Sequence, residues 1–282
     1  VAICGGAEAH SQTYYKYSTA VEPYKGIAPM PAPLKLAPTK EDDISMIEVS
    51  DLMARRWGIT REACDDFALR SQRRAAEAIE KGYFEEEILP LQVKYSRKGE
   101  AVTVDKDEHP RPQTDLAGLA KLRPVNEGGV TTAGNASGRN DGAAFVLMMS
   151  AEKAKELGYE PMAKWICGMD AGVDPKYMGI GPAYTNLKVM ERAGLKVKDI
   201  DVFECNEAFA AQCVACQRTL GIDEDKLNVN GGGISLGHPV GATGSRLVVT
   251  LLYELKRRGG KYGLATLCAG GGMGTAVLIK MA

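Results

Sequence analysis

Short apolar runs alternate with longer amphipathic segments through the second half of this chain. Short apolar runs predict β-strands, and apolar residues recurring at every third or fourth position predict helices. On this basis strands are expected at 164–169, 202–205, 262–268 and 275–280, and helices at 183–193, 207–220 and 245–258. Such alternation is typical of a layered α/β domain in which helices cover a mixed sheet.

The first half shows a less regular pattern. Residues 44–82 are expected to be helical, with Thr60 able to cap a helix that ends before Gly82. A helix is also expected at 151–157, a hairpin from 91–95 and 101–104, and a strand at 143–149. The chain opens with Val1-Ala2-Ile3-Cys4, which reads as a strand that turns at Gly5-Gly6. A chain rarely starts inside a strand, so we expect a further N-terminal portion that is cleaved, absent or carried by another polypeptide.

Composition narrows the class of protein. The 282 residues are 45% hydrophobic and 25% charged, with a formal net charge of −1, which indicates a folded chain of about two domains. We expect one domain over 1–160 and another over 161–282. The balanced charge gives no nucleic-acid footprint and no basic membrane patch, and no apolar run is long enough to span a bilayer.

The seven cysteines do not suggest a disulfide framework, because their number is odd and their spacing irregular. A reducing compartment fits better, so we expect a cytoplasmic protein, or one of an organelle matrix. Cys213 and Cys216 form a Cys-x-x-Cys pair inside a predicted helix, and the chain has no second pair to complete a zinc site. Helix packing is therefore favoured over a metal, and no metal is expected.

Glycine-rich segments stand where strands end or helices begin, the places where α/β proteins build sites. His238 lies in one of them, 231–244, a loop suited to close backbone approach, so a catalytic role is favoured over a structural one. Cys268 ends a strand just before Gly270-Gly271-Gly272, where packed and reactive thiols are equally plausible. The 231–244 loop lacks the Gly-Lys-Ser/Thr of a phosphate loop and the spacing of a dinucleotide loop.

Three ordered motifs carry a family resemblance. They are Asn206-Glu207-Ala208-Phe209-Ala210, the run Gly231 to Arg246 containing Gly237-His238-Pro239, and Cys268-Ala269-Gly270-Gly271-Gly272-Met273-Gly274. In this order they resemble the thiolases, acetyl-CoA acetyltransferase and 3-ketoacyl-CoA thiolase, and the likeness extends upstream over nearly all of the chain. It implies an α/β thiolase-like layered fold, with helices packed on mixed five-stranded sheets, a complete C-terminal half, a partial N-terminal half and a loop domain inserted at about 12–125.

The resemblance implies thiolysis of 3-ketoacyl-CoA or the reverse Claisen condensation of acetyl-CoA. Cys268 resembles the family's acid/base cysteine, whose pKa its surroundings can bring near neutrality. His238 resembles the histidine that activates the nucleophile, Asn206 would orient a water at one oxyanion hole, and the Gly270 N–H would serve the second.

Further positions match the family's coenzyme A groove. Ser137 resembles the residue that contacts the pantetheine arm, and Ala133, Met178 and Phe209 match positions along the same tunnel. Arg111 matches a CoA-contacting position, with a solvated surface charge as its alternative. CoA and acyl-CoA would be substrates, with no permanently bound cofactor, and complete subunits would form a homodimer or tetramer.

The family's nucleophilic cysteine, in a Cys-x-Ser-Gly type motif, has no counterpart here. Cys4 precedes Gly5-Gly6 and matches a non-catalytic strand position. We therefore expect this chain alone to be inactive and to need a complementary N-terminal thiolase segment. The alternative is a non-catalytic CoA-binding relative, although retention of Asn206, His238 and Cys268 favours the enzyme. One departure, Ile44-Ser45-Met46-Ile47 in place of the family's His-Met-Gly, borders the acyl pocket.

Overall fold

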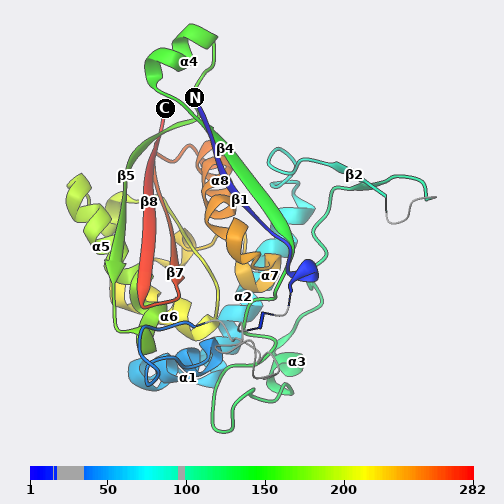
Figure 1. Ribbon diagram of the computed structural model, residues 1–282, viewed down its shortest axis with the longest axis vertical. Helices are drawn as coiled ribbons and strands as arrows, with labels where there is room; N and C mark the ends of the chain where they lie inside the picture. Colours follow the sequence, from blue (N-terminus) through cyan, green and yellow to red (C-terminus); the bar gives the residue numbers. More distant parts are fainter. Residues whose placement is uncertain (15, 18–34, 95–98) are drawn as a thin grey trace, which may run out of the picture.

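A four-stranded mixed sheet forms the centre of the second half of the chain (Figure 1). The computed structural model describes residues 1–14, 16–17, 35–94 and 99–282. The strand order is β5 (Ala163–Gly172), β8 (Met273–Met281), β7 (Tyr262–Ala269) and β6 (Val202–Cys205). The β6–β7 pair is parallel and the other pairs are antiparallel, which confirms the expected mixed sheet.

Helices cover both faces of this sheet. Neighbouring residues on one strand point to opposite faces, and Phe203 packs into the core formed with α5 (Gly181–Ala193) and α6 (Ala210–Leu220). Val202 instead packs against Leu251 and Leu255 of α8 (Val240–Arg258). Both faces are therefore closed, which explains why β6 is buried along its whole length.

The expected five-stranded sheet is wrong in the part of the chain that the structure describes, where this sheet has four strands. The strands β1 (Ala2–Glu8) and β4 (Gly142–Met148) pair with each other as a separate antiparallel ribbon. They lie alongside α8, whose other side packs on β6 and β7 (Figure 1). Because α8 separates the ribbon from the sheet, the two cannot join edge to edge.

The expected turn at Gly5-Gly6 is also wrong, since β1 continues without a break to Glu8. The reason is a close approach of two backbones. A Cβ on Gly6 would lie 1.9 Å from the carbonyl oxygen of Gly241, at the start of α8. Glycine here lets the strand press against the helix rather than turn away from it.

Two helices occupy the segment 44–82, which is helical as expected. They are α1 (Met46–Trp57) and α2 (Arg61–Glu80). Gly58 ends α1 in the left-handed region, with φ of 59°, and Thr60 then caps α2 by accepting a hydrogen bond from the Ala63 N–H. The α2 helix packs on α6 and on the short helix α7 (Gly233–Leu236). The segment 231–244, expected to be a loop, therefore contains α7 and the start of α8, and residues 237–239 connect the two helices.

The remaining elements surround this core. They are β2 (Leu91–Val93), β3 (Val102–Val104), α3 (Leu116–Ala120), α4 (Ala151–Leu157) and 3-10 turns at His10–Gln12, Pro175–Ile180, Val197–Asp199 and Glu224–Lys226. The expected hairpin is confirmed in β2 and β3, with its tip, 95–98, outside the described residues. Part of the expected loop domain, 18–34, also lies outside them, and the division at residue 160 stays a prediction. Among described residues, no helix combines the length and apolarity of a bilayer span.

Candidate active site

Asn206 and Cys268 lie at one edge of the mixed sheet. The strands β6 and β7 run parallel, with Cys205 opposite Thr266, so their carboxyl ends meet there. Asn206 follows directly, and its N–H donates to the Thr266 carbonyl at 2.9 Å. Cys268 stands two residues further along β7. The topology therefore places both residues at the edge where α/β proteins bind ligands.

The helix expected from 207 begins at Ala210, and Phe209 before it is extended. The stretch 207–209 pairs with the 135–137 segment instead. Ala136 and Phe209 form an antiparallel bridge, and the Ser137 N–H donates to the Ala208 carbonyl at 3.0 Å. Two predicted CoA contacts, Ser137 and Phe209, are thereby brought next to Asn206.

His238 completes the cluster. Its Nε2 lies 3.3 Å from Asn206 Nδ2, and its Nδ1 lies 2.6 Å from the Thr243 hydroxyl oxygen. Thr243 donates its own proton to the Pro239 carbonyl at 2.8 Å, so it must accept from His238 Nδ1–H. Nε2 is then the unprotonated nitrogen, and it accepts from the Asn206 amide. The ring is held with its basic lone pair toward the sheet edge.

Burial favours the neutral form of His238. Desolvation is the main cause that lowers the pKa of His238 to about 4, and the positive charge of Arg246 and the nearby His10 act in the same direction. At neutral pH the ring is therefore unprotonated and Nε2 is a hydrogen-bond acceptor, while the lowered pKa makes it a weak base within this chain alone. Asn206 is 1% exposed, and its Oδ1 has no hydrogen-bond partner among the described residues, which leaves an acceptor at the site.

Cys268 is half-buried at the end of β7. Burial, with a smaller contribution from Cys216, raises the pKa of Cys268 to about 12 rather than bringing it near neutrality. Apolar neighbours from the core pack against the residue, and no cation is among the causes of the shift. With the groups that this chain provides, the thiol holds its proton at neutral pH and is a proton donor.

The Cys-x-x-Cys pair lies behind the site in α6, and both thiols are buried. Cys213 donates to the Asn206 carbonyl at 3.3 Å and Cys216 to the Gly179 carbonyl at 3.3 Å. Within the described residues, no group of three or more His, Cys, Asp or Glu side chains could hold a metal ion. These contacts agree with the helix-packing interpretation of the pair.

The other predicted contacts are more dispersed. Gly270 is exposed in the turn between β7 and β8, where Gly271 donates to the Leu36 carbonyl at 2.7 Å. Ala133 and Arg111 are exposed, and the Arg111 N–H donates to Gln72 Oε1 at 2.8 Å. Met178 is 7% exposed and packs in the core, so it presents little surface to a ligand in this structure.

Sequence reasoning missed the polar groups that support the cluster. The Glu207 carboxylate, 1% exposed, accepts from Ser71 Oγ at 2.6 Å, Asn228 Nδ2 at 2.9 Å and Ile234 N–H at 3.2 Å. Desolvation raises the pKa of Glu207, and these hydrogen bonds oppose that rise. Its place beside Asn206 in the motif was a signal, whereas nothing in the sequence connected Ser71 or Asn228 to it.

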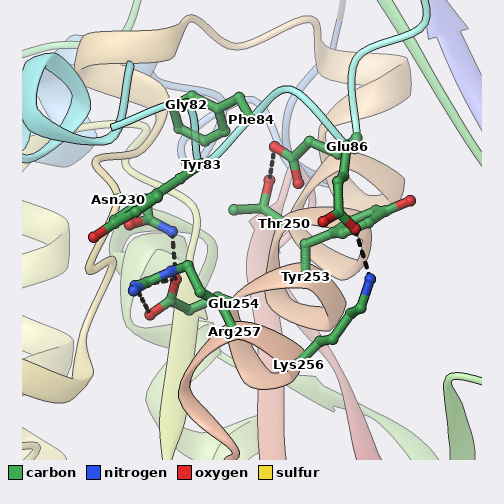
Figure 2. A pocket seen from close by; sticks show the side chains of 11 residues that line it. Gly82, Tyr83, Phe84, Glu86, Asn230, Thr250, Tyr253, Glu254, Lys256 and Arg257 are labelled. Carbon is green, nitrogen blue, oxygen red and sulfur yellow. Dashed lines mark hydrogen bonds and ion pairs between the residues drawn. The ribbon is translucent and has the colours of Figure 1, made fainter. Parts of the chain in front are cut away.

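A cavity of about 220 Å³ lies away from this cluster, between the second half of α8 and the 82–87 segment (Figure 2). Most of its charged groups are paired, and Glu87 accepts a hydrogen bond from Thr250. Glu254 binds Arg257, Arg258 and Asn230, and Lys256 pairs with Glu86. The cavity is lined by Thr250 and Tyr253, well along α8 from His238, and it does not include the predicted site residues.

Comparisons with known proteins cover both halves of the chain. The family "Thiolase, N-terminal domain" matches residues 1–152 and "Thiolase, C-terminal domain" matches 159–281. The acetyl-CoA acetyltransferase of Syntrophomonas wolfei is 55% identical over 227 residues, which are 79% of this chain and 57% of the relative. The beta-ketothiolase BktB of Cupriavidus necator is 49% identical over 84% of this chain and 60% of the relative.

Solved structures show the same likeness in three dimensions. The acetyl-CoA acetyltransferase of Bacillus anthracis has a TM-score of 0.92 and 43% identity, covering 99% of this chain and 71% of that one. Human mitochondrial 3-ketoacyl-CoA thiolase in complex with CoA has a TM-score of 0.90 and 40% identity, covering 99% of this chain and 70% of that one. The chain thus spans about three fifths of the curated relatives' length.

Proposed function

The chain belongs to the thiolase family, and on that premise we propose that it forms the larger part of an acyl-CoA acyltransferase. The proposed reaction is thiolysis of 3-ketoacyl-CoA or the reverse Claisen condensation of acetyl-CoA. Support comes from relatives named acetyl-CoA acetyltransferase and beta-ketothiolase. The observation that carries the proposal is the contact of His238 with Asn206 at the sheet edge that also holds Cys268.

His238 is assigned the role of base. Its Nε2 lone pair, in the Nδ1–H tautomer held by Thr243, takes the proton of an attacking thiol. Asn206 and a water that it orients, together with His238, stabilise the oxyanion of the thioester. A neutral ring suits this sequence, because it enters as a base and leaves as a hydrogen-bond donor.

Cys268 is assigned the transfer of a proton at the α-carbon of the second substrate or at the sulfur of CoA. Its protonated thiol can donate to the leaving enolate in thiolysis, and the Gly270 N–H would stabilise the oxyanion that forms. In the condensation direction Cys268 must first become a thiolate, which a pKa of about 12 disfavours. We infer that groups from outside this chain, or the bound substrate, lower that pKa in the complete site.

The acyl group needs a nucleophile that this sequence does not supply in the family's Cys-x-Ser-Gly form. We propose that the cysteine comes from a complementary N-terminal thiolase segment or chain, and that complete subunits act as a homodimer or tetramer in the cytoplasm or an organelle matrix. Ser137, Phe209, Ala133 and Met178 would line the pantetheine path. Arg111, exposed beside α2, would bind a CoA phosphate.

An assay with and without that segment tests the proposal. The 282-residue chain alone should not cleave acetoacetyl-CoA, and addition of a polypeptide with the Cys-x-Ser-Gly motif should restore thiolysis. In the restored enzyme, Cys268→Ser should lower turnover strongly while labelled acyl-enzyme still forms, and His238→Ala should lower both. Turnover by the chain alone would overturn the proposed source of the nucleophile. Binding of CoA without any restored turnover would support the non-catalytic alternative.

A further inference from the structure

The segment 234–238 begins in α7 and forms the loop that carries His238. Side chains from distant parts of the chain hold it at both ends. At its start, in α7, both the N–H and the carbonyl of Ile234 are bonded to side chains. Its N–H donates to Glu207, and its carbonyl accepts from His109 Nε2 at 3.1 Å and from Gln72 Nε2 at 3.3 Å. At its end, the His238 N–H donates to Asn140 Oδ1 at 3.2 Å.

His109 and Asn140 are themselves linked. Asn140 Nδ2 lies 3.4 Å from His109 Nδ1. A carbonyl can only accept, so His109 Nε2 must carry its proton toward Ile234, and Nδ1 of the neutral ring is then free to accept from Asn140. That direction leaves Asn140 Oδ1 for the His238 N–H. All three bonds agree on a single set of proton positions.

Two glycines make room for this pair. A Cβ on Gly138 would lie 2.4 Å from His109 Cε1, and one on Gly237 would lie 2.6 Å from Asn140 Cγ. Gly237 also has a φ of 95°, which few other residues adopt. The absence of a side chain at Gly138 and Gly237 therefore leaves the space that the His109 ring and the Asn140 amide occupy.

We propose that His109 is a positioning residue for His238, acting through Asn140 and the Ile234 carbonyl in its neutral Nε2–H tautomer. His109 and Asn140 precede His238 by 129 and 98 positions in the sequence, and both reach the loop that carries it. By holding the Ile234 carbonyl and the His238 N–H, they set the loop from which the His238 ring reaches Asn206 and Thr243. An effect of His109 on turnover rests on the proposed function, in which His238 is the base.

The surroundings of His109 favour the required protonation state. Its charged neighbours are Asp107 and Arg111 on its own segment, and the groups that face it from other elements, Asn140, Gln72 and the Ile234 carbonyl, are neutral. Burial is the main cause that lowers the pKa of His109. A protonated ring would turn Nδ1 into a donor facing the Asn140 amide donor, and the link would break.

The chain has three histidines, which makes an NMR test direct. In the 282-residue chain labelled with ¹⁵N-histidine, His238 should give the Nδ1–H tautomer and His109 the Nε2–H tautomer. Asn140→Ala should speed amide exchange at His238 about tenfold, the effect of losing one hydrogen bond. His109→Leu should speed it by a smaller factor, because the Asn140 amide loses its partner, and both variants should mix the His238 tautomers. Exchange within α8 should stay unchanged.

His109→Gln provides the rescue. Glutamine can place an amide donor and a carbonyl acceptor where the neutral ring has Nε2–H and Nδ1, so His238 should keep the parent exchange rate and tautomer. Asn126→Ala, which removes an amide bonded to Asp51 elsewhere, is the matched control and should leave His238 unaffected.

Unchanged exchange and tautomer of His238 in His109→Leu would overturn the proposal, and unchanged values in Asn140→Ala would overturn the link through Asn140. An Nδ1–H tautomer of His109 in the parent chain would overturn the proposal whether or not His109→Leu folds. A His109→Gln variant as disturbed as His109→Leu would also overturn it. None of these readouts needs turnover, so failure of the proposed reaction and failure of this inference give different results.

Discussion

The two sides of α8 differ in how completely they are closed. On one side the mixed sheet packs its apolar residues against Leu247, Leu251 and Leu255, all with 0% exposure, and α5 and α6 cover the far face of the same sheet. On the other side the β1–β4 ribbon packs one face on α8 and turns the other outward. There Ile3 is 76% exposed, Phe145 55% and Leu147 51%.

The mixed sheet is thus covered on both faces, whereas the β1–β4 ribbon is covered on one face and exposed on the other. The register pairs Ile3 with Leu147 and Gly5 with Phe145, so the exposed side chains form one continuous apolar surface. Large exposed apolar surfaces of this kind mark places where another polypeptide packs. Under the proposed function, the segment that supplies the nucleophile has such a surface to cover.

The largest effect on the free energy of unfolding is expected when leucine is replaced by alanine on the two sides of α8. Leu251→Ala should lower the free energy of unfolding by about 2–5 kcal/mol, because it opens a cavity in the closed core. Leu147→Ala should change it by less than about 0.5 kcal/mol, because that side chain is already half exposed. Urea unfolding measures both. Equal losses would mean that the ribbon's outer face is buried in solution.

The contact between the ribbon and α8 can be tested at Gly6. Gly6→Ala should cost about 1–3 kcal/mol, since its Cβ would meet the Gly241 backbone and neither side can move freely. Hydrogen exchange should rise along β1 and β4 while the mixed sheet stays protected. Gly172→Ala, at a position with no atom within 4 Å of the new Cβ, is the control and should be nearly neutral.

A third test measures how stability depends on pH through Glu87, which contacts Thr250 of α8. Burial raises the pKa of Glu87 to about 7, where its carboxylate accepts from Thr250 and faces Arg246, Asp107 and Glu254. Because the folded pKa lies above the unfolded one, this group destabilises the fold increasingly as pH rises from about 4.5 to 7. Glu87→Gln should therefore be nearly neutral at pH 4.5 and stabilising by up to about 3 kcal/mol at pH 8.

Thermal unfolding across that pH range checks the sign. Glu86→Gln is the control, because Glu86 is exposed and pairs with Lys256 at the surface. It should show no matching pH dependence. A Glu87→Gln effect that is largest at low pH would contradict the burial of this carboxyl group.

The smallest effect on stability is expected when the N-cap residues of two helices are replaced by alanine. Thr60→Ala should cost about 1 kcal/mol, since the Thr60 hydroxyl accepts from Ala63 at the start of the buried helix α2. Ser150→Ala removes the same kind of bond from the seven-residue helix α4, which follows the open ribbon. There we expect faster local exchange and little change in the urea midpoint. A larger loss at Ser150 would show that α4 is part of the main cooperative unit.

Much of the local structure followed from the residue pattern. The strands near 202, 262 and 275 and the helices near 61, 151 and 183 appear where periodicity predicts them, because each buries a stripe or a face that its own spacing defines. The motifs also identified the family. Predictions failed where one backbone meets another. Gly5-Gly6 continues a strand that presses on α8, and residues 207–209 pair with 135–137 instead of starting a helix.

Residue types and their order were sufficient to single out Asn206, His238 and Cys268, since glycine-rich turns and strand ends are local features. Their protonation states were decided only by packing. The neutral His238, the raised pKa of Cys268 and the supporting bonds from Glu207, His109 and Asn140 arise from groups that lie far apart along the chain. Desolvation and hydrogen bonding depend on what surrounds a side chain in space, and the fold, not the local sequence, brings those neighbours together.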